Sequence, residues 1–363
     1  MNERAAAPPS NMNSAATKQG MIEATNKVLA GKNLSRAEAE AVMEIVLSGG
    51  ASDAEIVALL TALRAKGETV DELVGFAASM RRHATPILPN GCAGAEEVLV
   101  DTCGTGGDTS GTFNISTAAA FVVAGAGVRV AKHGNRSISS RCGSADVLEA
   151  LGVAIDISGK RAGEAIMEVG IGFLFAPAVH TAMKHAMPAR RQISGRTVFN
   201  LLGPLTNPAG ASAQLVGVFD AAWTGLLARA LGELGVRRAF VVHGAGGLDE
   251  ISLAGESFVA ELRDRTVRSY SVAPEDFGLE HAPLEAFAGG DAQHNARIIR
   301  QILDGETGPQ RDIVLANASA ALVAAGHAAD FRDGVGRAAA AIDSGAARAK
   351  LDDLAAFTPS EKK

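Results

Sequence analysis

The chain has 363 residues, of which 47% are hydrophobic and 20% charged, and its formal net charge is -6. This composition provides enough apolar material for a large core and two domains. The net negative charge argues against a general nucleic-acid binder, because such proteins concentrate basic residues to neutralise phosphates. The three cysteines (Cys92, Cys103 and Cys142) form no CxxC pair, so neither a disulfide framework nor a zinc site is expected, and a reducing cytoplasm fits.

The two ends of the chain are expected to be tails. Residues 1–19 are small and polar, and they lack the apolar segment of roughly 7–15 residues that a signal peptide needs. We expect them to be disordered, and we treat residues 351–363 as a C-terminal tail. The most apolar stretch, which begins at Thr117, is shorter than the ~20 residues that span a bilayer. No membrane role is expected.

Residues 20–90 are expected to form a small all-helical domain. Apolar residues recur there at helical spacing, and three capping boxes open successive segments: Ser35 and Glu38, Ser52 and Glu55, and Thr69 and Glu72. Glycines at positions 31, 49, 50 and 67 stand where the helices should end, because glycine adopts the left-handed conformation at low cost. The pattern predicts four short helices.

From about residue 98, short β-rich runs alternate with alanine-rich helical stretches, which predicts an α/β domain. Strands are expected near residues 98, 128, 173, 214 and 237, and an antiparallel hairpin is expected at residues 257–272. We assign residues 91–176 and 201–350 to this large domain, with a mixed, mostly parallel central sheet. The polar helical segment at about residues 177–200 is expected to complete the helical domain, with a hinge at residues 175–177.

A glycine-rich loop follows the first of these strands, in DTCGTGGDTSGTFNISTAAA. Its glycines let backbone N–H groups approach phosphate oxygens, and the helix that begins near Ser116 adds unpaired donors. The string is neither a Walker loop nor a GxGxxG fingerprint, so ATP and NAD are disfavoured. Asp108 would repel a bare pyrophosphate, so we expect a diphosphate that carries Mg²⁺. An ordinary glycine-rich turn is the alternative.

The second constellation is VAKHGNRSISSRCGSADVLEALG, which follows the strand near residue 128. Lys132 can neutralise a phosphate, and Asn135 and Ser144 can supply neutral donors. A solvated loop is the better interpretation for the two arginines of this string taken singly. His133 taken alone could equally be a structural hydrogen-bonding residue.

The third feature is HGAGGLDEISL, where Asp249 and Glu250 follow a strand and a glycine-rich turn. Adjacent carboxylates suit a metal. They are a poor glycosidase pair, because those enzymes place two carboxyl groups on opposite sides of a sugar. A surface acidic pair is the alternative, but the surrounding apolar residues favour a site.

With these segments in view, the chain resembles the anthranilate phosphoribosyltransferase family from residue 21 to about 345. Six strings occur in the family's order and spacing: GTGGD, NISTAAA, KHGNRSISSRCGSADVLEALG, RTVFNLLGPLTNP, GLDEIS and GGDAQHNARIIRQIL. The resemblance implies phosphoribosyl transfer from 5-phosphoribosyl pyrophosphate (PRPP) to the amine of anthranilate, in tryptophan biosynthesis. The products would be N-(5-phosphoribosyl)anthranilate and pyrophosphate. It also implies the architecture shared with nucleoside phosphorylases, and a homodimer through the helical domain.

Motif matching with the family implies the site residues. Those for PRPP are Gly104, Thr105, Gly107, Asp108, Thr112, Asn114, Ser116, Thr117, Lys132 and Ser144. Those for anthranilate are Gly104, Asn135, His180 and Arg190, and the arginine suits the aromatic carboxylate. Two Mg²⁺ ions per subunit are implied, with Ser116 as a ligand of one and with Asp249 and Glu250 as ligands of the second.

The sequence departs from the family pattern at two places. Gly246 replaces an acidic residue of the usual HGxDGLDE, and Ser194 and Gly195 are substituted in the usual LG[VI]RT. Neither departure removes a motif ligand. They bear on the geometry of the turn before the acidic pair and on the stiffness of the loop after Arg190.

No covalent nucleophile is expected, because Cys103 has no base partner in the sequence pattern. We therefore expect direct displacement at C1 of the ribose, with inversion and strong dissociative character. Two other functions stay open at this point: a nucleoside phosphorylase of the same architecture, and a nucleic-acid-binding relative without catalysis. The intact GTGGD loop argues against the first, and the acidic charge with the retained acidic residues argues against the second.

Overall fold

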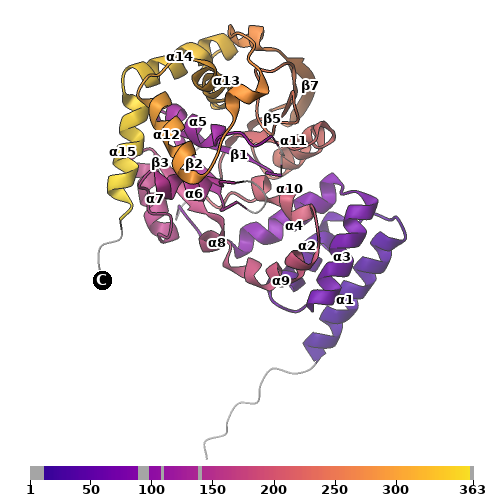
Figure 1. The fold of residues 1–363 in the computed structure, drawn as a ribbon. Coiled ribbons are helices and arrows are strands. Elements are labelled where there is room, and N and C mark those ends of the chain that lie inside the picture. The colour runs from indigo at the N-terminus through magenta and orange to yellow at the C-terminus, as the bar shows by residue number, and fades with distance from the viewer. Residues whose placement is uncertain (1–11, 89–97, 108–109, 138–140, 360–363) are drawn as a thin grey trace, which may run out of the picture. The chain divides into compact units, whose positions relative to one another are not determined.

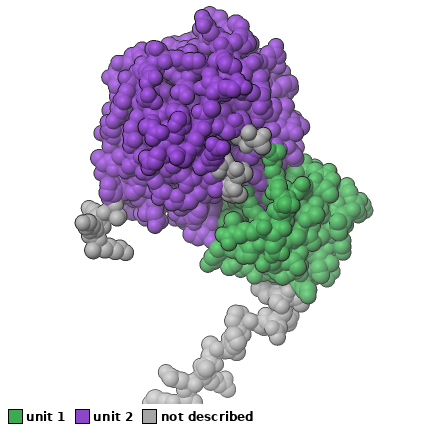
Figure 2. Space-filling view, viewed as in Figure 1, with its two compact units in different colours: residues 1–83, 182–198 green, residues 84–181, 199–363 purple. Residues whose placement is uncertain are grey.

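A computed structural model describes residues 12–88, 98–107, 110–137 and 141–359 of the chain (Figure 1). The chain divides into two compact units (Figure 2). The helical unit comprises Met1–His83 and Ala182–Val198, and the α/β unit comprises Ala84–Thr181 and Phe199–Lys363. The helical unit is therefore built from two separate segments. In the part of the chain that the structure describes, no helix is long and apolar enough to cross a membrane.

The helical unit begins with the four helices that the sequence predicts: α1 (Met12–Leu29), α2 (Arg36–Leu47), α3 (Asp53–Lys66) and α4 (Val70–His83). Its second segment contributes most of the 3-10 helix η1 (Thr181–His185) and all of α9 (Met187–Gln192). The Ser35 and Ser52 side chains accept from the backbone N–H groups of Glu38 and Glu55, and both capping boxes are complete. The glycines at 31, 49 and 67 have φ values of 72°, 76° and 86°, as expected for residues that end helices.

One expectation about this unit is wrong. Residues 12–19, which we assigned to a disordered tail, form the first turns of α1. Their alanine, lysine and glutamine residues are good helix formers, so low hydrophobicity there did not mean disorder. Gly20 continues the helix close to α2, where an added Cβ would lie 3.3 Å from Ile45 Cδ1. Residues 1–11 of the same expectation lie outside the described residues.

The third capping box holds a buried charge. Glu72 is fully buried and accepts hydrogen bonds from the backbone N–H groups of Leu34 (2.9 Å) and Thr69 (2.8 Å). Its carboxylate also pairs with the almost fully buried Lys66 ammonium at 3.0 Å. A buried carboxylate is tolerated only when it is paired and hydrogen-bonded in this way. The residue predicted as a cap therefore also ties α4 to the α1–α2 connection.

The α/β unit contains a seven-stranded sheet in the described residues, in the order β3-β2-β1-β4-β5-β6-β7. The strands are β1 (Leu99–Gly104), β2 (Arg129–Gly134), β3 (Ile171–Phe175), β4 (Ala213–Gly217), β5 (Arg238–Gly244), β6 (Ser257–Arg263) and β7 (Thr266–Val272). The first five are parallel and the last two are antiparallel. The predicted mixed, mostly parallel sheet is confirmed, as is the hairpin at its edge. Asp264 and Arg265 turn that hairpin with φ values of 48° and 66°.

Helices and short 3-10 segments connect and cover this sheet (Figure 1). They are α5 (Ile115–Gly125), α6 (Ser144–Ala150), α7 (Gly159–Glu168), α8 (Ala176–Val179), α10 (Val198–Leu205), η2 (Ala221–Trp223), α11 (Thr224–Glu233), η3 (Pro274–Phe277), η4 (Leu284–Phe287), α12 (Ala292–Leu303), α13 (Pro309–Ala324), α14 (Phe331–Asp343) and α15 (Ala346–Phe357).

Strand order reverses beside β1. The chain moves from β1 to β2 and β3 on one side, and then returns to place β4 on the other side. In open parallel sheets, ligands bind outside the carboxyl ends of the strands at such a switch point. The loops that follow β1 and β4 are therefore where the topology favours a site.

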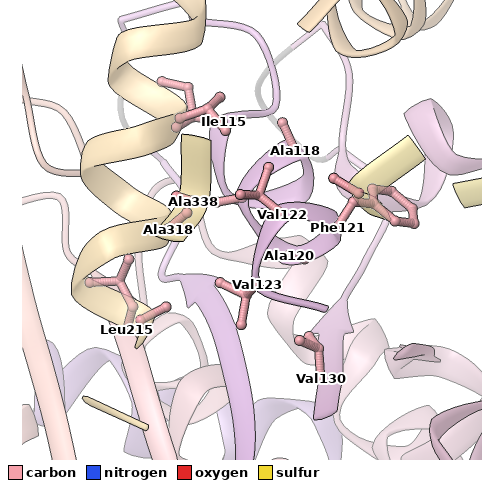
Figure 3. Packing of buried hydrophobic residues seen from close by; sticks show 14 of the residues in the cluster. Ile115, Ala118, Ala120, Phe121, Val122, Val123, Val130, Leu215, Ala318 and Ala338 are labelled. Atoms are coloured by element: carbon pink, nitrogen blue, oxygen red, sulfur yellow. The ribbon is translucent and has the colours of Figure 1, made fainter. Parts of the chain in front are cut away.

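Helix α5 lies at the centre of the core. Its residues are apolar or small on every side, as expected for a helix buried all round. Figure 3 shows Val122 beside Ala318 of α13 and Ala338 of α14, with Val130 and Leu215 of the sheet nearby. At the end of α5, an added Cβ at Gly125 would lie 2.6 Å from the Ala347 backbone of α15. The glycine thus permits close packing between α5 and α15.

The C-terminal assignment also needs correction. Residues 351–357 belong to α15 rather than to a tail, and Leu351 and Leu354 are buried against the core. The Thr358 hydroxyl accepts the Ala154 N–H at 3.0 Å and donates to the Leu354 carbonyl at 2.9 Å. A single turn of apolar spacing near the end of a sequence is too short a pattern to separate a docked helix from a tail.

Candidate active site

The glycine-rich loop lies against the acidic pair. Gly104 ends β1 opposite Gly217 of β4, and the next N–H, that of Thr105, donates to the Gly217 carbonyl at 2.9 Å. An added Cβ at Gly104 would lie 2.6 Å from Asp249 Oδ2, and one at Gly217 would overlap the Asp249 carbonyl. Both glycines are therefore required by the close approach of Asp249 to the ends of β1 and β4.

Two hydrogen bonds fix this arrangement. The Gly106 N–H donates to Asp249 Oδ2 at 3.1 Å, and the Ser116 N–H donates to Glu250 Oε1 at 3.1 Å. Ser116 lies in the first turn of α5, where carboxylates are stabilised by the helix dipole. The acidic pair thus contacts both the glycine loop and the helix start predicted to bind phosphate groups.

Lys132 brings a positive charge to the same place. It is buried within β2, and its Nζ donates to the Thr102 carbonyl at 2.6 Å and lies 3.4 Å from Ser116 Oγ. Burial lowers the pKa of Lys132, whereas the charges of Asp101, Glu250 and Asp249 raise it. Lys132 is therefore within electrostatic reach of both members of the acidic pair.

Sequence reasoning missed a buried carboxylate beneath this lysine. Asp101 is fully buried in β1, with Oδ1 accepting the His133 N–H at 3.1 Å and Oδ2 accepting the Asn207 side chain at 2.8 Å. Burial raises the pKa of Asp101, and these bonds together with the charge of Lys132 oppose that rise. The available signals were an aspartate inside an apolar strand and the second asparagine, Asn207, of the string RTVFNLLGPLTNP.

The second loop is linked to the first through polar side chains. Asn114 Nδ2 donates to the Cys142 carbonyl at 3.1 Å, and Ser144 Oγ donates to the Asn135 carbonyl at 3.3 Å. Thr112 forms an isolated β-bridge with Ala288. Four of the predicted residues, Thr112, Asn114, Asn135 and Ser144, thus lie in segments that other parts of the α/β unit hold in place.

Two histidines lie together in the α/β unit. The rings of His133 and His180 are 5.1 Å apart at their centroids, both side chains are buried, and neither Nε2 has a hydrogen-bond partner among the described residues. Burial lowers the pKa of His133 to about 3 and that of His180 to about 4. Both imidazoles are therefore neutral at physiological pH. The resemblance assigned a role to His180 and none to His133.

Three other predicted site residues are Arg190, Thr117 and Asp108. Arg190 lies on α9 of the helical unit, and burial lowers its pKa. Thr117 is fully buried in α5, and its Oγ1 has no hydrogen-bond partner among the described residues. Asp108 lies outside the described residues.

The departures from the family pattern are accommodated locally. Gly246 and Gly247 have φ values of 81° and 79°, and a Cβ at Gly246 would overlap the Leu284 side chain. In the helical unit, the Ser194 carbonyl accepts a 2.8 Å hydrogen bond from Arg64 Nη1, and Gly195 has a φ of 87°. The loop after α9 is thus anchored to α3 by Arg64.

The acidic pair and Ser116 fit a magnesium ion. In the described part of the chain, no group of three or more His, Cys, Asp or Glu side chains is arranged to hold a metal ion. Mg²⁺ does not need one, because it is commonly bound through one or two carboxylates together with substrate phosphates and water. Asp249 and Glu250 supply hard oxygen donors at the glycine loop, and a carboxylate has about four acceptor positions, so it can accept from an N–H group and bind a cation at the same time.

Family models match both units of the chain. The α/β domain of the glycosyl transferase family matches residues 96–348, and the helical bundle domain of that family matches residues 22–84. Together they span the helical and α/β segments described above.

Individual relatives agree. Anthranilate phosphoribosyltransferase from Pelotomaculum thermopropionicum is 56% identical over 335 residues, which are 92% of this chain and 96% of the relative. The enzyme of the same name from Solibacter usitatus is 58% identical over 329 residues, which are 91% of this chain and 96% of the relative.

Solved structures of enzymes with this name are also similar. The one from Thermus thermophilus is 45% identical with a TM-score of 0.87 and covers 93% of this chain and 99% of its own. The one from Saccharomyces cerevisiae, in complex with PRPP and Mg, is 26% identical with a TM-score of 0.83, and the match covers 94% of this chain and 98% of the yeast chain. With the switch-point loops, the acidic pair and these similarities together, the chain belongs to the anthranilate phosphoribosyltransferase family, whose members transfer a phosphoribosyl group in tryptophan biosynthesis.

Proposed function

We propose that the residues around the ends of β1, β2 and β4 carry out the family's reaction with Mg²⁺ as the divalent cation. The chain transfers the phosphoribosyl group of PRPP to the amine of anthranilate, giving N-(5-phosphoribosyl)anthranilate and pyrophosphate. The observation that carries the proposal is that the glycine loop, Lys132 and the acidic pair lie together near the carboxyl ends of β1, β2 and β4. The names of the relatives do not favour a nucleoside phosphorylase or a nucleic-acid-binding protein.

The pyrophosphate would be held by the glycine loop. Residues 104–107 form a turn with positive φ at Gly106 and Gly107 next to the start of α5. The Gly106 and Ser116 N–H groups donate to the acidic pair in this structure, so each would bind a phosphate oxygen by exchanging that carboxylate for the ligand. Lys132 supplies the positive charge next to Ser116. Asn114 and Ser144 would hold the ribose and its phosphate. Thr105, Thr112, Thr117 and Asp108 remain predictions for the same ligand.

Magnesium would be held by Ser116, Asp249 and Glu250, and we retain two ions per subunit as a prediction. The chemistry that a bound Mg²⁺ supplies at such a site is neutralisation of negative charge on the departing pyrophosphate. The protein's own contribution is preorganisation, because the acidic pair is already fixed by the Gly106 and Ser116 N–H groups. The yeast relative was solved with PRPP and Mg, which supports the choice of cation.

Direct displacement at C1 of the ribose needs no covalent nucleophile. Burial raises the pKa of the Cys103 thiol well above its usual range, with a further contribution from Asp101, so the nucleophilic thiolate is strongly disfavoured. The remaining requirement is to hold the weak aromatic amine on the face opposite the leaving group. We propose Gly104, Asn135, His180 and Arg190 for anthranilate. The neutral His180 imidazole adds no charge next to the aromatic amine.

We further propose a cytoplasmic homodimer that forms through the helical unit. Ile22 and Leu29 of α1 are seven residues apart, so they share one helix face, and both are exposed, Leu29 by 67%. Cys103 and Cys142 are free thiols, as expected in a reducing compartment. Sedimentation analysis of the wild type and of Leu29→Glu tests the dimer, since the added charge should give monomers.

One assay tests the function. Anthranilate fluorescence should fall only when the protein, PRPP and Mg²⁺ are all present, and chelation of the cation should stop the change. Arg190→Ala should raise the KM for anthranilate far more than the KM for PRPP, because guanidinium pairing with a carboxylate would be lost. A wild-type protein that consumes no anthranilate under these conditions, or one that cleaves nucleosides with phosphate instead, contradicts the proposal.

A further inference from the structure

The string GGDAQHNA contains a buried asparagine that contacts the predicted PRPP loops. Asn295 of α12 is 1% exposed. Its Oδ1 accepts the Gly290 N–H at 2.7 Å, and its Nδ2 donates to Asn114 Oδ1 at 3.0 Å. The Asn114 side chain in turn donates to the Cys142 carbonyl. These two amide groups therefore join three segments that are far apart in the sequence.

The contact determines how Asn114 is used. Asn114 stands at the N-cap of α5, where asparagine normally accepts a bond from the helix backbone, yet its side chain makes no capping bond. Instead, its oxygen is taken by Asn295, and its nitrogen donates to the Cys142 carbonyl at 3.1 Å. The donor from Asn295 fixes which way the Asn114 amide faces. The Asn114 side chain therefore does not stabilise the start of α5, and its hydrogen bonds instead fix the orientation of its own amide.

Neighbouring backbone strengthens the same link. The Phe113 N–H donates to the Phe287 carbonyl at 3.0 Å, and the Gly289 N–H donates to the Gly111 carbonyl at 2.8 Å. An added Cβ at Gly289 would lie 2.6 Å from the Phe113 nitrogen. The segment that leads into α12 is thus paired closely with residues 111–113, and Asn295 closes the arrangement from the first turns of the helix.

We propose that Asn295 is a positioning residue for PRPP, acting through Asn114 and the Cys142 carbonyl to hold residues 111–114 and 142–144 in register. The inference rests on the proposed function, in which Asn114 and Ser144 bind the ribose and its phosphate. Asn295 does not itself contact the substrate. Its effect is to fix the amide of Asn114 and to set the carbonyl two residues before Ser144.

The first test is Asn295→Asp, which keeps an acceptor for the Gly290 N–H and removes the donor to Asn114. A carboxylate oxygen of the new aspartate would then face Asn114 Oδ1, and because the two oxygens repel each other the Asn114 amide must move or turn. We expect the Kd of PRPP with Mg²⁺, measured by calorimetry, to rise about tenfold, as for loss of one well-placed hydrogen bond to a binding loop. The KM for PRPP should rise in parallel, while the KM for anthranilate stays within about twofold of wild type.

Two further variants separate positioning from lost stability. Ser319→Ala removes another buried hydrogen bond of the α/β unit, to the Phe331 carbonyl, without touching either loop, and it should leave the Kd of PRPP unchanged. In an Asn114→Ala background, Asn295→Asp should add no further loss, since the residue through which it acts is gone. Asn295→Ala serves in the same comparison if the aspartate variant does not fold.

A Kd for PRPP in Asn295→Asp equal to that in Ser319→Ala would overturn the inference, as would full additivity with Asn114→Ala. The proposed function fails differently. A wild-type protein that binds PRPP but forms no phosphoribosylanthranilate contradicts the function, and the comparison of Kd values among these variants still tests the inference.

Discussion

The helical unit and the switch-point loops of the α/β unit are stabilised by contacts of opposite range. In the helical unit, the boundaries of α2 and α3 are set by residues three positions apart, as in the pair Ser52 and Glu55. In the α/β unit, the glycine loop is held by Asp249, which is 143 positions from Gly106, and Asn114 is held by Asn295, which is 181 positions away.

This difference separates two physical tasks. Local caps stop a helix wherever it lies, so they determine the elements but not the geometry of a site. Long-range bonds to loop backbone fix where N–H groups and carboxylates lie relative to each other, which is what binding a charged ligand requires. We therefore expect changes in helices α1 to α4 to act mainly on stability and changes at the switch point to act mainly on catalysis.

The largest expected effect is at a long-range polar contact of the helical unit that is buried. Glu72→Ala removes the partner of buried Lys66 and the acceptor of the Leu34 N–H, so we expect unfolding to become easier by about 3–5 kcal/mol. Urea unfolding followed by circular dichroism measures this, and fluorescence of Trp223 reports on the α/β unit. Asp71→Ala, which breaks only an exposed ion pair with Arg36, should cost under about 1 kcal/mol. Equal losses in the two variants contradict the prediction.

Changes in the acidic pair should reduce activity rather than stability. Asp249→Ala removes the acceptor of the Gly106 N–H and a proposed magnesium ligand, so we expect kcat/KM to fall by about 10²–10³ with little change in stability. Asp249→Asn keeps an acceptor for the N–H and loses the charge, so an equal loss there assigns the effect to the cation. Steady-state kinetics at several Mg²⁺ concentrations distinguish the two. The exposed Glu256→Ala is the matched control, and a loss in that variant would argue against a local role.

The buried histidines predict a pH dependence of stability. In the folded protein the pKa values of His133 and His180 are about 3 and 4, below the value of about 6.5 for an unfolded chain. Their contribution is complete above pH 6.5 and is lost as the pH falls towards 4, because the unfolded chain takes up protons that the folded one excludes. We expect a slope of about 1.4 kcal/mol per pH unit for each histidine in that window. His180→Gln should reduce the slope, and the exposed His281→Gln should not.

The smallest expected effect is that of a single local cap. Ser52→Ala should lower the free energy of unfolding by about 1 kcal/mol and leave the KM values unchanged, since the bond to the Glu55 N–H is local to α3. Ser52→Asp, which can still cap, should be close to wild type. A change in KM for either substrate in Ser52→Ala would show that the two regions are less separate than their contacts indicate.

The same contrast explains what could be predicted from the sequence. The capping pairs, the glycines at helix ends and the alternating β and helical runs gave the helices of the first unit and the strands and hairpin of the second, because those signals act over a few residues. The glycine loop and the acidic pair were recognised as separate motifs. Their contact, which requires Gly104 and Gly217 for the approach of Asp249, depends on strand order and could not be read from spacing.

Other features of the structure leave no pattern in the sequence that is long enough to predict them. Asp101 of β1 and Asn207 are 106 positions apart, and Asn207 also donates to the Ala131 carbonyl of the neighbouring strand β2, so their contact depends on the tertiary fold. The predictions for the two ends of the chain were wrong, because segments that we expected to be tails are helical. Residues 12–19 are helical although they contain few large apolar residues, and residues 351–357 form the end of a helix whose Leu351 and Leu354 are buried against distant parts of the core.

The close packing of Gly125 against Ala347 has a practical consequence for handling the protein. Helix α15 packs against α5, the helix whose first turn contains Ser116. Removing α15, by ending the chain before residue 346, would therefore expose apolar residues of α5 to water. Affinity tags belong after Thr358, and a protease that trims further back should inactivate the enzyme and promote its aggregation.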